Sequence, residues 1–167
     1  MAIAERRRYR EGEVLFAQGH ICRQLFFVIS GVARISITQD NGQTAVLFFV
    51  REQKFCTILK SFLHQTIAHE TIAAACDMDV YVLRRDALYA LYTAVPYLQN
   101  LITQITQQTL LDKISMQSGF AGMDAAARYK HFLEHMPDVA ARVALGDIAA
   151  FLGITPQSLS RIRKQLK

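Results

Sequence analysis

The sequence predicts an α+β protein in which a β-rich domain, one long helix and a small helical domain follow one another along the chain. Three observations lead to this prediction. Short apolar runs separated by turn residues fill the chain up to Pro96, whereas residues 97–118 contain neither glycine nor proline. Beyond Gly122, helical patterns of moderate length are separated by glycine and proline. We therefore assign residues 1–95 to the β domain, 96–119 to the long helix and 120–167 to the helical domain.

The strands of the β domain are predicted from apolar runs that end at turn residues. The clearest of these runs cover residues 25–29, 32–38, 45–50 and 79–83. Asn41-Gly42 lies between the second and the third run, and this pair favours a tight hairpin with positive φ at both positions. Glycines at positions 12, 19 and 31 are spaced as in small antiparallel barrels. Asp86 is expected to cap a short helix that ends before Pro96.

The long helix carries apolar residues on more than one face. Its first half has a stripe formed by Leu98, Leu101, Ile102 and Ile105, and its second half has Leu110, Leu111 and Ile114 on a different face. The first stripe fits a seam between two copies of the helix, and it also fits packing against the protein's own β domain. Gly119 and Gly122 are expected to end this helix. Asp124 then has the chemistry of an N-cap for a helix over 125–136 that stops at Pro137.

The segment 144–167 predicts a helix-turn-helix, two helices packed at a steep angle through a short turn. The close crossing needs a small residue, which Ala149 supplies, and the turn needs a residue that tolerates positive φ, which Gly153 supplies. Thr155 can cap the second helix, with Pro156 at its first position. The residues expected to brace both helices from within are Ile148, Leu152, Ile154, Leu159 and Ile162.

The second of these helices has the composition of a recognition helix. From Ile154 onward the charge is +4 without an acidic residue. Because the early exposed face of such a helix reaches base edges, we assign base contacts to Thr155, Gln157 and Arg161, with Ser158 and Ser160 in support. Arg163 and Lys164 are assigned to phosphates. The alternative is a basic, solvated helix end on a domain that meets protein.

Composition sets the cellular context. Hydrophobic residues make up 51% of the 167 residues and charged residues 20%, which suits a packed core, and the net charge of +5 makes an anionic partner plausible. Cysteines 22, 56 and 76 form no C-x-x-C pair, so we expect a reduced, cytoplasmic protein without disulfides or a bound metal. No apolar run reaches the ~18–20 residues of a membrane span, and the charged residues 5–8 do not fit a signal peptide.

Taken in order, these features resemble the Crp/Fnr family of bacterial transcription regulators. The similarity begins with Tyr9-Arg10-Glu11-Gly12-Glu13-Val14-Leu15-Phe16, includes residues 25–31 and the Asp40-Asn41-Gly42 turn, and ends with the helix-turn-helix at 148–163. The resemblance implies a cyclic-nucleotide-binding-type sensor barrel, built as a double-stranded β-helix of the jelly-roll type, and a homodimer that pairs through the long helix. It also implies recognition of a palindromic site in double-stranded DNA, with RNA polymerase as a further candidate partner.

The chain departs from this family where nucleotide-binding members hold the cyclic phosphate. Those members carry a Gly-Glu pair and then an Arg-Ser or Arg-Thr pair, whose arginine neutralises the phosphate. Here Cys56 stands at the glycine position, Ala68 or His69 stands at the arginine position, and residues 55–71 contain no arginine. A histidine is a poor substitute for a permanent bidentate cation, so we predict no tight binding of cyclic AMP. No cofactor is predicted.

The effector is therefore left open. Axial ligation of haem would need one of His20, Cys22, Cys56, His64 and Cys76, and the sequence favours none of them. Relatives also carry a helical segment before the first strand and a β wing after the recognition helix. With eight residues before Tyr9 and an end at Lys167, we expect neither of these features here, and we expect a modest intrinsic affinity for DNA.

Two other functional classes are considered. His131-Phe132-Leu133-Glu134-His135 matches H-x-x-E-H, the order found in inverted zinc peptidases, but a third ligand downstream would have to be Asp138 or Asp147. Because the intervening residues have the pattern of a buried helix face, we predict that the protein is not an enzyme. The remaining alternative to a regulator is a degenerate sensor or protein-interaction module that no longer binds DNA.

Overall fold

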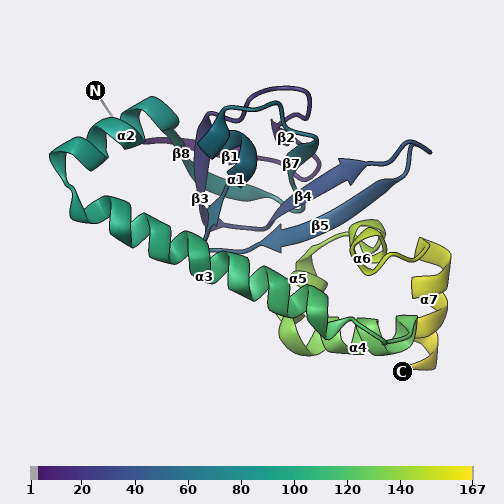
Figure 1. Ribbon diagram of the computed structural model, residues 1–167. Coiled ribbons are helices and arrows are strands. Elements are labelled where there is room, and N and C mark those ends of the chain that lie inside the picture. Colours follow the sequence, from purple (N-terminus) through teal and green to yellow (C-terminus); the bar gives the residue numbers. More distant parts are fainter. Residues whose placement is uncertain (1–3, 167) are drawn as a thin grey trace.

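The computed structural model describes residues 4–166 and contains an eight-stranded antiparallel β-sandwich followed by helices (Figure 1). One sheet has the order β1 (Ala4–Tyr9), β8 (Met78–Arg84), β3 (Gln24–Ser30), β6 (Phe55–Cys56). The other has the order β2 (Val14–Phe16), β7 (Glu70–Ala74), β4 (Ala33–Thr38), β5 (Thr44–Val50). The predicted α+β class and the antiparallel β domain are confirmed. The four predicted strands match β3, β4, β5 and β8 to within one residue at each end.

The hairpin between β4 and β5 is tight, but its turn differs from the predicted one. Thr38 and Thr44 are the last paired residues, and the backbone N–H of Gln39 donates to the carbonyl of Gln43 at 2.8 Å. Gly42 has a φ of +80°, whereas Asn41 is not among the residues with positive φ. The prediction of positive φ at both positions was therefore wrong. The loop enclosed by the Gln39–Gln43 hydrogen bond has three residues, 40–42, and a loop of this length needs a left-handed residue only at its end.

Two short helices border the sandwich, α1 (Leu59–His64) and α2 (Arg85–Ala94). Asp86 lies inside the first turn of α2 and not at its N-cap, which is Arg84. Its carboxylate pairs with the Arg84 guanidinium at 2.7 Å, so the predicted cap was misplaced by two residues.

The long helix α3 (Tyr97–Gly119) runs past the sandwich from α2 to the helical domain (Figure 1). None of its described residues is fully buried. Leu98, Ile102 and Ile105 are half-buried against the protein's own elements, whereas Leu101 is 45% exposed. Leu111 and Ile114, in the second half, are more exposed still. The helix thus has apolar residues facing its own sandwich and others facing outward.

Four helices complete the chain: α4 (Ala125–His135), α5 (Pro137–Arg142), α6 (Leu145–Leu152) and α7 (Pro156–Gln165). Asp124 caps α4 as predicted, accepting from the N–H of Ala127 at 2.8 Å. Pro137 ends α4 and also begins α5, which the sequence did not predict as a separate helix. Proline is favoured at a first helical position, where its missing N–H has no partner to lose. No helix among residues 4–166 is long and apolar enough to cross a membrane.

The helical domain shares a hydrophobic core with the sandwich. Val32, Val46 and Phe49 from the sandwich are buried together with Phe132, Leu152 and Leu159 from the helices. The ring of Phe49 lies 6.3 Å from that of Phe132 and 5.2 Å from that of Phe151, measured between ring centres. Separation of the sandwich from the helical domain would expose these large aromatic side chains to water. The sandwich and the helical domain are therefore packed as one unit.

Candidate nucleic-acid interface and sensor cavity

Helices α6 and α7 are joined by the three-residue turn Gly153-Ile154-Thr155 and cross steeply in the view of Figure 1. Gly153 has a φ of +67° and ends α6, where a residue with a Cβ would be strained. The Thr155 hydroxyl accepts from the N–H of Ser158 at 3.2 Å and so caps α7, with Pro156 in its first turn. The local chemistry that predicted this turn is therefore present residue by residue.

One side of this helix pair is buried and the other faces solvent. Ala149 and Leu159 are completely buried, and Ile148 and Leu152 are nearly so. Burial of the apolar residues at these spacings fixes the rotation of α7 about its own axis, because the opposite face must then be exposed. The residues left on that face are polar or basic.

The exposed residues of α7 include most of those assigned to DNA. Gln157, Arg161, Arg163 and Lys164 are exposed, whereas Ser158 and Ser160 are half-buried. Thr155 is exposed, but its hydroxyl donates to the Ser158 hydroxyl at 3.0 Å as well as capping the helix. Within residues 4–166, none of the three cations forms an ion pair. Lys167, counted in the basic charge above, lies outside the described residues.

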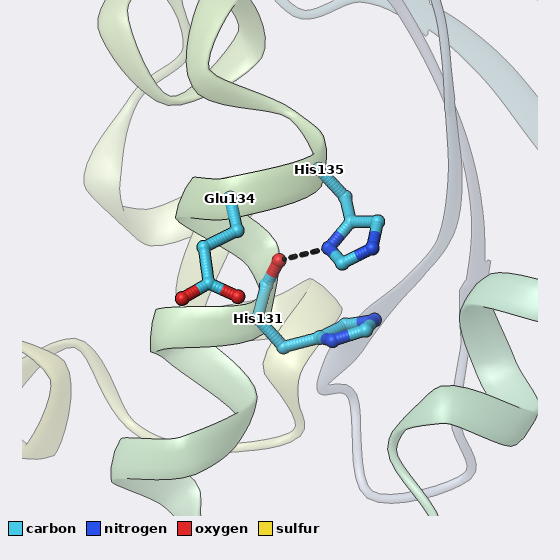
Figure 2. A group of neighbouring side chains, drawn as sticks. All are labelled: His131, Glu134 and His135. Atoms are coloured by element: carbon cyan, nitrogen blue, oxygen red, sulfur yellow. Dashed lines mark hydrogen bonds between the residues drawn. The ribbon is translucent and has the colours of Figure 1, made fainter.

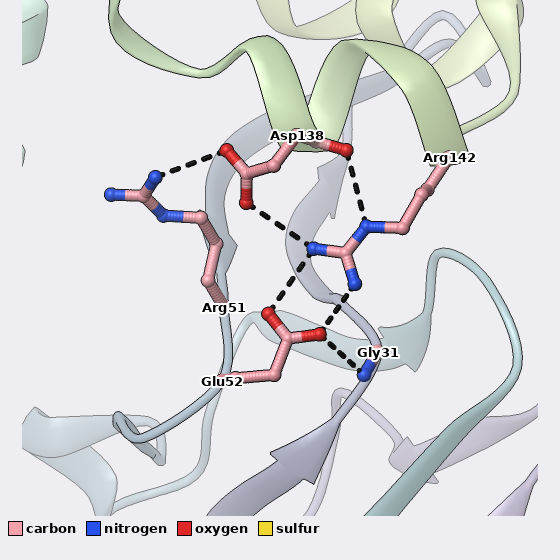
Figure 3. A network of polar contacts seen from close by, with 5 residues as sticks. All are labelled: Gly31, Arg51, Glu52, Asp138 and Arg142. Carbon is pink, nitrogen blue, oxygen red and sulfur yellow. Dashed lines mark hydrogen bonds and ion pairs between the residues drawn. The ribbon is translucent and has the colours of Figure 1, made fainter.

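A polar network, which sequence reasoning missed, ties α5 to the sandwich (Figure 3). The Arg142 guanidinium forms a two-pronged ion pair with Glu52, the second bond measuring 3.1 Å, and it also donates to Asp138 at 3.2 Å. Glu52 accepts in addition from the backbone N–H of Gly31 at 2.8 Å, and Arg51 donates to Asp138 at 3.1 Å. The hydrogen bonds from Arg142 lower the pKa of Glu52 to about 2. The sequence shows that residues 51–52 and 138–142 carry opposite charges, but no sequence pattern indicates that these two segments lie in contact.

A second ion pair holds α6 against the sandwich. Arg34 on β4 donates to the carboxylate of Asp147 in the first turn of α6, and both side chains are largely buried. Asp147 is also favourably placed near the positive end of the helix dipole. Together with the Arg142 network, this pair fixes where α6, and hence α7, points relative to the sandwich.

Between the sandwich and α3 lie two adjoining cavities of about 200 and 270 Å³. They share the lining residues Leu25, Thr57, Leu59, Thr106 and Leu110. The walls are mainly apolar, and the charged residues that line them are Lys60, Glu70 and Lys113, all in the first cavity. Within the described chain no arginine lines either one.

Comparison with known proteins identifies the sandwich. The family model of the cyclic nucleotide-binding domain matches residues 6–94, which is more than half of the chain. The chain belongs to the cyclic nucleotide-binding domain family. No curated protein sequence matches the chain.

Solved structures share the fold over nearly the whole length. FixK2 from Bradyrhizobium japonicum has a TM-score of 0.82 at 19% identity, covering 99% of this chain and 85% of that one. The c-di-GMP-responsive global regulator CLP from Xanthomonas campestris has a TM-score of 0.78 at 22% identity, covering 98% and 86%. A Crp/Fnr-family transcriptional regulator from Thermus thermophilus has a TM-score of 0.74 at 15% identity, covering 97% and 85%. At these identities the similarity shows that the arrangement of sandwich, long helix and C-terminal helices is a shared fold.

Within the cyclic nucleotide-binding domain, the segment expected to hold a phosphate uses its polar groups internally. The Ser61 hydroxyl accepts from the N–H of Cys22 at 2.8 Å and donates to the carbonyl of Thr66. The side chain of Gln65 donates to the Phe62 carbonyl at 2.9 Å. Cys56 is buried, and this burial raises the pKa of its thiol to about 12.

The positions where an arginine was expected carry no cation that faces the cavities. Ala68 is buried and His69 is exposed, and neither lines either of the two cavities. Two arginines from outside this segment contact it. Arg85 is half-buried, its Nε donates to the Phe62 carbonyl at 2.9 Å, and its guanidinium covers the ring of Tyr89. The Nε of Arg23 donates to the side chain of Gln65 at 3.3 Å.

The residues considered as haem ligands are spread over the domain. Cys22 and Cys56 are buried and Cys76 is half-buried, whereas His20 and His64 are exposed. The Cys22 thiol lies 3.4 Å from the Thr57 hydroxyl and 3.5 Å from the Gln24 carbonyl. None of the five lines either of the two cavities described above.

His131, Glu134 and His135 place their ligand atoms within 4.8 Å of one another on α4. The His135 Nδ1 is already 2.8 Å from the His131 carbonyl, and in Figure 2 the Glu134 carboxylate lies on one side of that carbonyl and both rings on the other. The downstream carboxylates, Asp138 and Asp147, are both engaged in ion pairs with arginines. The two rings stack with their centres 3.9 Å apart.

Proposed function

We propose that the chain is a dimeric DNA-binding transcription regulator of the Crp/Fnr type that reads a palindromic site with α7. The observation that carries the proposal is the exposed set of Arg161, Arg163 and Lys164, unpaired among the described residues, on a helix whose other face is buried. An exposed cation without a protein partner is available to a phosphate or a base edge, and DNA supplies both. The shared fold with regulators, as their names describe them, supports the same assignment.

The side chains of α7 have different roles in this proposal. Gln157 and Arg161 are one turn apart on the exposed face, where Gln can pair with adenine and Arg with guanine in the major groove. Arg163 and Lys164, further along the helix, bind phosphates. Thr155 and Ser158 act mainly by stabilising the first turn of α7, since their hydroxyls hydrogen-bond to each other. Ser160, which is half-buried, supports the contact of α7 with the bases.

The dimer forms through α3. The predicted stripe of Leu98, Leu101, Ile102 and Ile105 contributes its exposed member, Leu101. Leu111 and Ile114, on a different face of the second half of α3, offer further exposed apolar surface. A two-fold dimer would place two copies of α7 in successive major grooves, about 34 Å apart along the duplex. RNA polymerase is the partner through which such a regulator would act.

Cyclic AMP does not control this regulator in our proposal. A cyclic phosphate buried without a matched guanidinium would lose hydration that no donor replaces. Calorimetric titration of the purified protein with cyclic AMP should therefore give no binding in the low-micromolar range. Binding in that range would contradict the proposal on this point.

The function is tested by selecting bound duplexes from a random DNA pool with the full chain. We expect enrichment of an inverted repeat with half-sites one helical turn apart, because the two recognition helices are related by a two-fold axis. Recovery of no sequence, together with no measurable binding of any duplex at low salt, would favour the protein-interaction module instead.

A further inference from the structure

One of the two cavities between the sandwich and α3 is lined by a half-buried cation, Lys113, that forms no ion pair with the residues that the structure describes. Lys113 lies on α3 and lines the first cavity, and its ammonium group is 4.3 Å from the centre of the Phe48 ring. No carboxylate among residues 4–166 forms an ion pair with it, while the neighbouring Asp112 pairs with Lys54. Burial lowers the pKa of Lys113, because its ammonium group loses part of its hydration there.

The surroundings of Lys113 are apolar. Ile35, Leu47 and Phe48 line the cavity with it on the sandwich side. The cavity continues past Thr106 and Leu110 into the second one, whose walls include Phe62, Leu88 and Tyr92. From Lys113 back to Ile102, α3 rises ~16 Å, so the combined space is elongated along the helix. It has one cationic region near Lys113 and an uncharged far end.

We propose that these cavities bind a small, elongated monocarboxylic acid, with its carboxylate at Lys113 and its hydrocarbon body along α3 towards Leu88. The inference rests on the proposed function, because it assigns the ligand class of that regulator's sensor domain. A carboxylate supplies the counter-ion that Lys113 lacks, and a hydrocarbon body buries apolar wall at about 25 cal/mol per Å².

The walls favour such a ligand over a cyclic nucleotide. A nucleotide would bring ribose hydroxyls, phosphate oxygens and base edges into a space whose uncharged polar lining consists of threonine, glutamine and tyrosine side chains. Each buried polar atom left without a partner costs on the order of 1–3 kcal/mol. Glu70 and Lys60 also line the first cavity, and with Lys113 they leave a net charge of +1, which matches a single carboxylate.

The test is calorimetric titration of the full chain with octanoate and with octanamide, its uncharged analogue of similar size. We expect octanoate to bind at least tenfold more tightly than octanamide. Lys113→Met, which keeps the apolar stem, should weaken octanoate binding at least tenfold and leave octanamide unchanged. Lys60→Met, the matched control in an exposed position on the same cavity, should change octanoate binding less than twofold.

A second variant guards against misfolding of the first. Thr106→Phe fills the space where the two cavities meet and should abolish octanoate binding with Lys113 intact. The inference is overturned if octanamide binds as tightly as octanoate, if Lys113→Met binds octanoate like the wild type, or if octanoate does not bind at all. Binding of random duplex DNA by the same preparation separates the two proposals: intact DNA binding without octanoate binding overturns this inference alone.

Discussion

Two groups of arginines in this protein have opposite surroundings. At the junction between sandwich and helical domain, Arg34, Arg51 and Arg142 each face a carboxylate from a distant part of the chain. On α7, Arg161 and Arg163 face solvent, and no carboxylate among the described residues pairs with them. The first group uses its charge inside the protein, and the second leaves its charge for a partner.

This difference indicates that the junction arginines stabilise the fold and that the α7 arginines are available for binding a partner. The junction cations orient the helical domain, because each of them connects a sandwich residue to α5 or α6. The α7 cations add nothing to that orientation and raise the local positive potential. Substitutions at the junction should therefore change folding free energy, and substitutions on α7 should change DNA affinity. The predictions that follow test this division, starting with the largest effect.

Phe132→Ala should lower the free energy of unfolding by about 3–5 kcal/mol, since Phe132 is completely buried and its ring contacts both Phe49 and Phe151. Urea denaturation followed by circular dichroism measures the change. Leu166→Ala, at a residue 52% exposed, is the control and should stay within about 0.5 kcal/mol. A loss below about 1 kcal/mol for Phe132→Ala would show that the shared core does not hold the two parts together.

Arg161→Ala should cost about 1–3 kcal/mol in affinity for the selected site and relax the preference at one base pair. The thermal midpoint should not move, because the side chain is exposed and has no partner among the described residues. Fluorescence anisotropy with site and random duplexes measures both affinities. Lys130→Ala on α4 is the control for the loss of one exposed charge. Equal losses on site and random DNA would show that Arg161 does not read a base.

The ion pair of Glu52 with Arg142 should make stability depend on acid. The pKa of Glu52 is lowered to about 2 from an ordinary value of 4.5, so its contribution is present above pH 4.5 and is lost as the pH falls towards 2. Because the pair is partly exposed, we expect a contribution of about 1–2 kcal/mol. Urea denaturation at several pH values should show a steeper acid loss for the wild type than for Glu52→Gln. If the free energy of unfolding falls equally with pH in the wild type and in Glu52→Gln, the ion pair does not contribute to stability. Glu134→Gln, at an exposed position on α4, is the control.

Lys164→Ala should have the smallest effect, below about 1 kcal/mol and nearly the same for every duplex. A phosphate contact carries no information about sequence, so the ratio of specific to random affinity should stay constant. Competition binding with site and random duplexes measures that ratio. A selective loss at the site would assign Lys164 to base reading instead.

Local chemistry explains how much of this structure the sequence could predict. Gly153 ends α6 with positive φ, Thr155 caps α7 and Pro156 begins it, and each of these roles depends only on neighbouring residues. The turn between α6 and α7 was therefore predicted at the correct positions. Asp124 was likewise identified as a cap by its immediate neighbours. Asp86, with the same chemistry, was misplaced because an arginine beside it competes for its carboxylate.

Long-range contacts could not be predicted in this way. Glu52 and Arg142 are 90 residues apart, and no periodicity links them. Lys113 had no feature that distinguished it from a solvated helix lysine until the sandwich placed Phe48 beside it. The strands β1, β2, β6 and β7 are short or charged, so they showed none of the apolar alternation that predicted their neighbours.

The central claim is that the cations of α7, which no carboxylate among the described residues pairs with, bind DNA. The affinity for random-sequence duplex as a function of salt tests this claim most directly. The wild type should bind more weakly as salt rises, on a straight line in log–log form. In a variant with Arg161, Arg163 and Lys164 all changed to alanine, the slope should be shallower by about 0.9 for each phosphate that the variant no longer neutralises. The same slope in both proteins, or no binding by the wild type even at the lowest salt, would contradict the account.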